Sequence, residues 1–363
     1  MLVLLASAAI ALLVSLLATP LFIRGFARIG WGQFIRDDGP QSHHVKRGTP
    51  TMGGLIFIVA TLIGYFGGKL LGQELPTQPA LLILLLMVGM GAVGFLDDFL
   101  KISNQRSLGL GGWAKVAGQV VVSVLFGVLA ITMLYHDGDR TIVDPVISGV
   151  RDIPWLDLTG WGAIGGIVFV LWILVMNVSA SNAVNVTDGL DGLATGSVII
   201  ATVGYAFIAF WQFNQSCFTA QPGPGCYDVL QPLDVATLAA TLVGALIGFL
   251  WWNTSPAQIF MGDVGSLALG GALAGFAIMT DTQLLLILIA GLPIIVTGSV
   301  IIQRAYFKAT GGKRVFLMTP LHHHFELKGW AEVTIVVRFW ILGGLFVAAG
   351  IGLFYFEWAL QGL

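Results

Sequence analysis

Apolar stretches of membrane-spanning length recur along the whole of this 363-residue chain. Within a bilayer the backbone has no water to bond, so each crossing stretch must satisfy its own polar groups, as an α-helix does. About 20 apolar residues are enough for one crossing. Ten stretches qualify, near residues 1–23, 51–70, 80–96, 113–135, 160–178, 194–213, 235–252, 265–280, 284–303 and 334–356. With only 10% of residues charged, the sequence predicts an all-α, polytopic integral membrane protein with about ten transmembrane helices, in one domain covering residues 1–363.

The basic residues are divided unequally between the two alternating sets of connections. Of the 17 Lys and Arg residues, three (Lys69, Arg140 and Arg151) fall in one set and the other 14 fall in the other set. Cytoplasmic connections of membrane proteins carry an excess of Lys and Arg. The larger set is therefore predicted to be cytoplasmic, which places both termini outside.

Both cysteines, Cys217 and Cys226, fall in one connection on the predicted outer side. An oxidising compartment permits a disulfide between them, but the spacing alone does not require one. Neither cysteine can reach a cytoplasmic site, so a zinc site built on cysteine is excluded.

A polar stretch lies between two strongly apolar runs, 161–176 and 197–211. Polar side chains recur there at every third position, at Asn182, Asn185, Asp188 and Asp191. A tight 3₁₀ turn would stack all four on one face, whereas a plain turn between two buried helices has a similar composition. Because carboxylates are costly to bury beside membrane-length apolar runs, we interpret the stretch as part of a functional site.

Two further carboxylate motifs lie at the predicted cytoplasmic ends of spans. Asp97 and Asp98 follow an apolar run and precede Lys101 by one helical turn, so a solvated salt bridge is the simpler alternative to a catalytic or metal-binding pair. The Asp-Asp-x-x-Lys order also weakens any comparison with prenyl-diphosphate synthases. Asp263, flanked by glycines, fits either a helix N-cap or a ligand-binding position equally well.

Three adjacent histidines, His322 to His324, stand in the last predicted cytoplasmic connection. They lack the i, i+4 spacing of a helical zinc site, and the nearby segment 311–314 lacks the pattern of a P-loop. All these motifs fall on the side that carries the excess of Lys and Arg. Carboxylates without cysteine suit Mg²⁺, and basic groups suit phosphates. The residues therefore indicate a Mg²⁺-dependent phosphotransferase that acts on a lipid phosphate at the cytoplasmic face.

Five motifs occur in order along the chain: Gly48-Thr49-Pro50-Thr51-Met52-Gly53-Gly54, Asp97-Asp98, Ser181-Asn182-Ala183-Val184-Asn185 through Gly192-Leu193-Ala194, Phe260-Met261-Gly262-Asp263 and Pro320-Leu321-His322-His323-His324-Phe325-Glu326. Together they closely resemble the phospho-N-acetylmuramoyl-pentapeptide-transferase family, over nearly the whole chain. Val186 and Val264 depart from the family pattern, in which Leu and Thr are expected, and the Cys217–Cys226 loop matches no family motif.

The resemblance implies a ten-helix protein of the bacterial cytoplasmic (inner) membrane, with both termini periplasmic and the active site on the cytoplasmic face. It implies the transfer of phospho-N-acetylmuramoyl-pentapeptide from its UDP carrier to undecaprenyl phosphate, which produces lipid I and UMP in the first membrane step of peptidoglycan synthesis. UDP-MurNAc-pentapeptide, undecaprenyl phosphate, the lipid bilayer and the cofactor Mg²⁺ are the implied partners, and no nucleic acid is expected.

The resemblance also assigns a role to each matching residue. Asp263 corresponds to the Mg²⁺ ligand, and Asp97 and Asp98 correspond to the acidic pair that binds or deprotonates the lipid phosphate. The polar wall around the diphosphate consists of Lys115, Asn182, Asn185 and Asp188. The uridine pocket consists of Gly189, Leu190, Asp191, Asn253 and Phe260, with Phe260 stacking on the base. The sugar side consists of Gln303 and the catalytic candidates His322, His323 and His324, and Lys46 is a further substrate-binding candidate.

Two other functions remain open at this point. A sister enzyme that transfers N-acetylglucosamine phosphate to the same lipid would share the aspartates, although the histidine run and the 48–54 motif argue against it. A secondary transporter would place its acidic residues near the bilayer midplane between repeated halves, and no repeat is visible. The sequence leaves open the oligomeric state, with a homodimer as one arrangement, and whether the transfer uses one step or a covalent phospho-enzyme.

Overall fold

The computed structural model describes residues 1–30, 32, 48–105, 109–135 and 140–361. Within these residues, nine helices are long and apolar enough to cross a membrane. They are α1 (Leu2–Ile29), α2 (Gly54–Gly72), α3 (Gln78–Ser103), α4 (Gly112–Thr132), α5 (Ala163–Thr187), α6 (Leu193–Asn214), α7 (Pro232–Asn253), α8 (Gly262–Met279) and α12 (Glu332–Gln361). Each covers one of the predicted apolar runs, and the prediction of an all-α membrane fold is confirmed.

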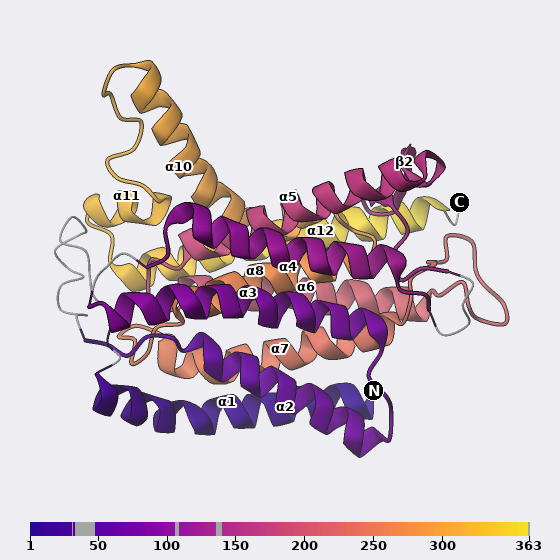
Figure 1. The fold of residues 1–363 in the computed structure, drawn as a ribbon, viewed down its shortest axis with the longest axis horizontal. Helices are drawn as coiled ribbons and strands as arrows, with labels where there is room; N and C mark the ends of the chain where they lie inside the picture. The colour runs from indigo at the N-terminus through magenta and orange to yellow at the C-terminus, as the bar shows by residue number, and fades with distance from the viewer. Residues whose placement is uncertain (31, 33–47, 106–108, 136–139, 362–363) are drawn as a thin grey trace.

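The shorter elements connect these helices. They are the antiparallel strands β1 (Val146–Ser148) and β2 (Asp152–Asp157), the 3₁₀ helix η2 (Thr159–Trp161), and the helices α9 (Leu286–Ile289), α10 (Gly291–Ala309) and α11 (Leu321–Leu327). The long helices run side by side along the horizontal direction of Figure 1, and α10 projects from the bundle next to α11.

The predicted span 284–303 is the one that differs in form from the other nine. It is divided between α9 and α10, with a break at Ala290, and α10 continues past the span to Ala309 and carries Arg304 and Lys308. The first residues of α1 and the last residues of α12 lie at the same end of the bundle (Figure 1). A chain whose two ends lie on the same side of a membrane crosses it an even number of times. We therefore expect α9 and α10 together to supply a tenth crossing beside the nine long helices of the described residues.

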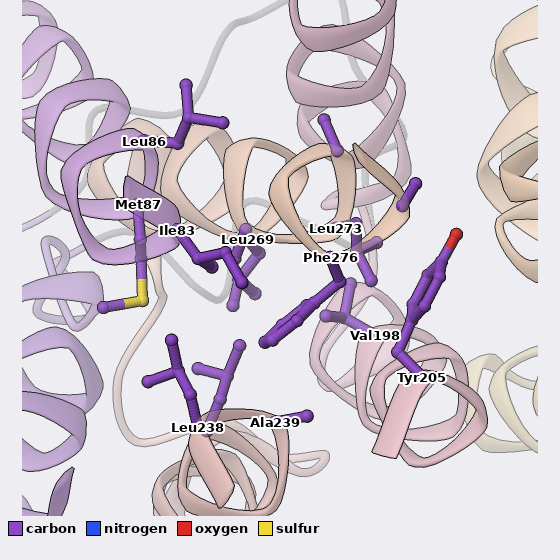
Figure 2. Close-up of a cluster of buried hydrophobic side chains, with 14 of the residues drawn as sticks. Ile83, Leu86, Met87, Val198, Tyr205, Leu238, Ala239, Leu269, Leu273 and Phe276 are labelled. Atoms are coloured by element: carbon purple, nitrogen blue, oxygen red, sulfur yellow. The ribbon is translucent and has the colours of Figure 1, made fainter. Parts of the chain in front are cut away.

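Helix α8 lies at the centre of the packing. Every residue from Val264 to Met279 is buried, and the surrounding apolar core is drawn from several helices (Figure 2). The labelled side chains are Ile83, Leu86 and Met87 of α3, Val198 and Tyr205 of α6, Leu238 and Ala239 of α7, and Leu269, Leu273 and Phe276 of α8. Small residues allow close backbone approach in membrane helices: a Cβ at Gly270 would overlap the backbone of Ser181 on α5. The position of α8, and of Asp263 at its start, is therefore tightly constrained.

The end of the bundle that carries both termini holds the three basic residues predicted to lie outside, and each of them is ion-paired. Lys69 Nζ lies 2.7 Å from Asp234 Oδ1, Arg140 Nη1 lies 2.6 Å from Asp228 Oδ1, and Arg151 Nε lies 2.8 Å from Glu357 Oε2. Cys217 and Cys226 form the disulfide that the sequence left open. Arg151 also donates to the Cys226 carbonyl at 2.7 Å, which ties the disulfide loop to α12. Which side of a bilayer this end faces stays a prediction.

Candidate active site

Three carboxylates meet where the last turns of α3 approach the start of α8. Asp97, Asp98 and Asp263 each offer one oxygen, and these oxygens lie within 4.8 Å of one another. The approach depends on Gly94, because a Cβ there would overlap the backbone carbonyl of Asp263. Asp263 stands in the first turn of α8, but its side chain does not cap the helix, so the N-cap interpretation is wrong.

One oxygen of each carboxylate accepts a hydrogen bond from a nearby N–H group. The Leu110 amide donates to Asp97 Oδ1 at 2.7 Å, the Val264 amide donates to Asp98 Oδ2 at 3.1 Å, and Asn185 Nδ2 donates to Asp263 Oδ1 at 2.6 Å. Asp98 thus supplies, from α3, an acceptor for an otherwise unbonded amide at the start of α8. Donors of this kind fix the side-chain rotamers, so the second oxygen of each carboxylate is presented to the same region.

Two lysines bind the second oxygens. Lys101 Nζ lies 2.6 Å from Asp97 Oδ2, 3.3 Å from Asp98 Oδ1 and 2.7 Å from Asp263 Oδ2. Lys115, from the start of α4, lies 2.8 Å from the same Asp263 oxygen. The salt bridge that the sequence offered as the simpler alternative is present, with Lys101 28% exposed, and it extends to an aspartate from another helix. Its i+3 and i+4 spacing from the acid pair was a visible signal of this role.

The three carboxylates of this centre offer oxygen ligands, the kind that Mg²⁺ prefers. Two of the three carboxylates, Asp97 and Asp98, are almost fully buried, at 3% and 4% exposed. Buried carboxylates gathered so closely repel one another unless cations compensate them. The residues present therefore fit a divalent cation as well as the two ammonium groups that partly neutralise them here.

The four polar side chains of the 182–191 stretch do not stack on one face. Asn182 and Asn185 lie on the last turns of α5, but the helix ends at Thr187, so Asp188 and Asp191 leave in other directions. Asn185 bonds Ser266 as well as Asp263, at 2.8 Å. Asn182 donates to Gln119 Oε1 of α4 at 3.1 Å. The two asparagines thus connect α5 to α8 and to α4.

Asp188 follows α5 directly and faces the acidic centre. Burial raises the pKa of Asp188 well above its usual range, and the nearby charges of Asp263 and Asp98 raise it further.

A second group of predicted residues holds the loop between α7 and α8. Asp191 Oδ2 accepts from the Ala257 amide at 2.9 Å, and Asn253 bonds Thr195 Oγ1 at 2.6 Å and the Ile259 carbonyl at 2.9 Å. Leu190 lies beside Asp191 in the same turn and is also buried. These contacts join the turn after α5 to the loop before α8, so the predicted base-binding residues do come together.

Phe260 lies on that loop, is half-buried, and is bonded through its backbone to the residues just before α2. Its amide donates to the Pro50 carbonyl at 2.9 Å, and its carbonyl accepts from the Gly53 amide at 2.8 Å. A Cβ at Gly54 would overlap the backbone of Gly265. Gly54 is therefore required for close contact with α8, whereas a Cβ at Gly53 would meet the Phe249 ring of α7 and the Phe260 carbonyl.

The histidines lie on α11. His322 is fully buried and packs against Gly189, because a Cβ at that glycine would overlap the imidazole ring. This contact connects the histidine run to the polar stretch after α5. His323 Nδ1 lies 2.6 Å from Glu326 Oε2, and His324 Nδ1 accepts from the Leu317 amide at 3.1 Å. Burial, and then the charge of Lys328, lowers the pKa of His324.

The side-chain amide of Gln303, predicted to lie on the sugar side of the substrate, bonds the backbone of the following loop. Its side-chain oxygen accepts from the amides of Val315 and Phe316, at 2.9 and 3.0 Å, and its nitrogen donates to the Phe316 carbonyl at 3.0 Å. It therefore organises the loop between α10 and α11. Lys46 lies outside the described residues. Glu332, which sequence reasoning missed, accepts from the Asp191 amide at 2.9 Å, and no sequence pattern pointed to it.

The fold and the site define a helical membrane protein with a carboxylate and lysine centre at one end. The model of glycosyl transferase family 4 matches residues 80–281, which places the chain among the membrane transferases. Signature 1 of the phospho-N-acetylmuramoyl-pentapeptide-transferases matches residues 46–58. The chain belongs to the phospho-N-acetylmuramoyl-pentapeptide-transferase family.

Relatives of that name match the chain from end to end. The protein of Clavibacter sepedonicus is 60% identical over 99% of this chain and 100% of its own length. Those of Pseudarthrobacter chlorophenolicus and Streptomyces avermitilis are 57% and 54% identical, the first over 99% of this chain and 100% of the relative, the second over 98% of each.

Proposed function

We propose that this chain transfers phospho-N-acetylmuramoyl-pentapeptide from its UDP carrier to undecaprenyl phosphate, and so produces lipid I and UMP. An oxygen of the lipid phosphate attacks the sugar-linked phosphorus of the diphosphate, and the bond from that phosphorus to the UMP oxygen breaks. The observation that carries the proposal is the convergence of three carboxylates and two lysines at one end of a membrane bundle. Transfer of this kind depends mainly on positioning and on neutralising the phosphate charges.

An apolar groove offers a path for the lipid substrate. It has a volume of about 360 Å³ and lies between α5, α8, α9 and α10, with Trp172 and Gln283 toward one end and Val184 toward the other. The residue after Val184 is Asn185, which holds Asp263. A polyprenyl chain can lie in such a groove with its phosphate at the carboxylate centre. The groove supports a lipid acceptor rather than a soluble one.

The second oxygens of Asp97, Asp98 and Asp263 would hold Mg²⁺, which would neutralise the diphosphate and make its phosphorus more electrophilic. Lys115 and Lys101 would bind phosphate oxygens. One member of the acid pair, Asp97 or Asp98, would accept the remaining proton of the lipid phosphate through a lone pair that does not bind the cation.

The remaining assignments follow the same geometry. Asp191, Asn253 and Phe260 border the loop before α8, where uridine would stack and bond, together with Gly189 and Leu190. Asn182, Asn185 and Asp188 would border the diphosphate. His322 to His324, with Gln303 and Lys46, would face the sugar and its peptide. Arg304, Lys308, Lys313 and Arg314 of the adjoining α10–α11 segment support a cytoplasmic position for this end, in a bacterial inner membrane.

The test uses the purified protein with UDP-MurNAc-pentapeptide, undecaprenyl phosphate and Mg²⁺. We expect UMP release together with a lipid-linked muramoyl product, and no turnover when Mg²⁺ is chelated. UDP-N-acetylglucosamine serves as the competing donor. Transfer of N-acetylglucosamine phosphate without any muramoyl product would assign the chain to the sister activity instead.

A further inference from the structure

The ammonium group of Lys101 takes the position of a bound cation among the three aspartates. A lysine ammonium has three N–H donors, and here it lies within 3.3 Å of one oxygen from each of Asp97, Asp98 and Asp263. The ammonium donates hydrogen bonds to Asp98 Oδ1 and Asp263 Oδ2, and it forms an ion pair with Asp97 Oδ2. In this arrangement Lys101 is bound to the carboxylates rather than available to a phosphate.

The Lys101 ammonium and a divalent cation would compete for the same carboxylate oxygens. Mg²⁺ binds oxygen at about 2.0–2.1 Å, so opposite ligands of one ion lie about 4.2 Å apart. The lysine nitrogen lies 2.6–3.3 Å from its three oxygens, and one oxygen from each carboxylate lies within 4.8 Å of the others. The ammonium therefore occupies the space that a metal ion would need, and a metal could bind these oxygens only if the ammonium left.

The charge balance points the same way. With Lys101 and Lys115 bound, three carboxylates keep one net negative charge. If a divalent cation replaced Lys101, the remaining groups would be neutral and a free ammonium would be available. The side chain is 28% exposed at the end of α3, so it has an outlet toward solvent.

We propose that the Lys101 ammonium occupies the divalent-cation position in the metal-free protein. A bound metal ion displaces it, and the released ammonium then binds the phosphates of the substrate. This rests on the proposed function only for the identity of those phosphates. Metal and diphosphate then bind cooperatively, because each favours the state in which Lys101 has left the carboxylates.

Binding of Mn²⁺ to the full-length protein, followed by electron paramagnetic resonance without nucleotide or lipid, tests the displacement directly. Lys101→Met should bind Mn²⁺ about ten- to a hundredfold more tightly than the natural protein, the effect of removing one charge-assisted competitor. Lys101→Arg, which keeps the charge, should stay close to the natural affinity, as should the exposed Lys308→Met control. Unchanged or weaker Mn²⁺ binding in Lys101→Met overturns the proposal.

A second measurement needs no variant, in case Lys101→Met does not fold. Amine-reactive labelling of the natural protein, read by mass spectrometry, should increase at Lys101 when Mg²⁺ is added, while Lys308 in the same digest stays constant. Labelling of Lys101 that does not respond to Mg²⁺ would also reject the displacement. Neither measurement uses a substrate, so a failure of the transfer reaction would be recognised separately.

Discussion

Replacing Asp263 by Asn should abolish turnover for a reason that can be worked out from its contacts. Oδ2 of Asp263 accepts from Lys101 and Lys115, and Oδ1 accepts from Asn185. An asparagine has one acceptor and one donor end. Whichever way it turns, its NH₂ group faces another donor, either the two ammonium groups or the amide of Asn185.

The loss can be given a magnitude. At least one hydrogen bond to a charged group is lost, which corresponds to about 1.5–3 kcal/mol. Asp263 would also help to hold the cation that stabilises the reacting phosphates, and loss of that preorganised electrostatic stabilisation adds about 2.7–4 kcal/mol. Together these give about 4–7 kcal/mol, or a rate reduction of roughly 10³- to 10⁵-fold.

The assay is single-turnover formation of lipid product, with Mn²⁺ affinity and thermal unfolding measured on the same preparation. Asp157→Asn is the matched control, since Asp157 is exposed at the opposite end of the bundle and should leave turnover unchanged. If Asp263→Asn kept a rate within tenfold of the natural protein while folded, the proposed role of Asp263 would be refuted.

Two further predictions concern stability and topology. Lys69 and Asp234 form an ion pair with side chains only 6% and 4% exposed, so Lys69→Met should destabilise the protein by about 3–5 kcal/mol and lower Tm by roughly 6–20 °C. Turnover per folded molecule should not change, and an unaltered Tm in detergent would contradict this account. Reporters fused after Arg314 should read cytoplasmic, and reporters at Gly223 should read outside. A cytoplasmic signal at Gly223 would invert the proposed orientation.

The helices and their grouping could be predicted because the bilayer restricts the chain so strongly. A long apolar run in lipid must bond its own backbone, so the runs alone located the nine long helices. Successive crossings alternate in direction, so residues as distant in sequence as Asp97, Asp191 and His322 could be assigned to one end without knowing how any helix packs.

Tertiary contacts decided the form of the 284–303 span and the bonding of Gln303. The span at 284–303 has the composition of a single crossing, but it breaks at Ala290 and continues as α10 away from the bundle. Gln303 has the polarity of a ligand-binding residue, yet its three hydrogen bonds go to the backbone of the next loop. Local composition cannot separate these outcomes, because the competing partner lies on another segment.

By itself, the sequence determined the class of fold, the clustering of the acidic motifs at one end and the residue types of the centre, since these depend on hydropathy, alternation and local chemistry. Only the tertiary structure decided which oxygen meets which donor. The C-terminal end of α3 reaches α8 because Gly94 lets the backbones approach, and that contact turns Asp98 into a cap for the Val264 amide. The same contact brings Asp263 to Lys101. Within its own helix the lysine of an Asp-Asp-x-x-Lys turn can pair only with the two aspartates before it, and α8 supplies the third carboxylate.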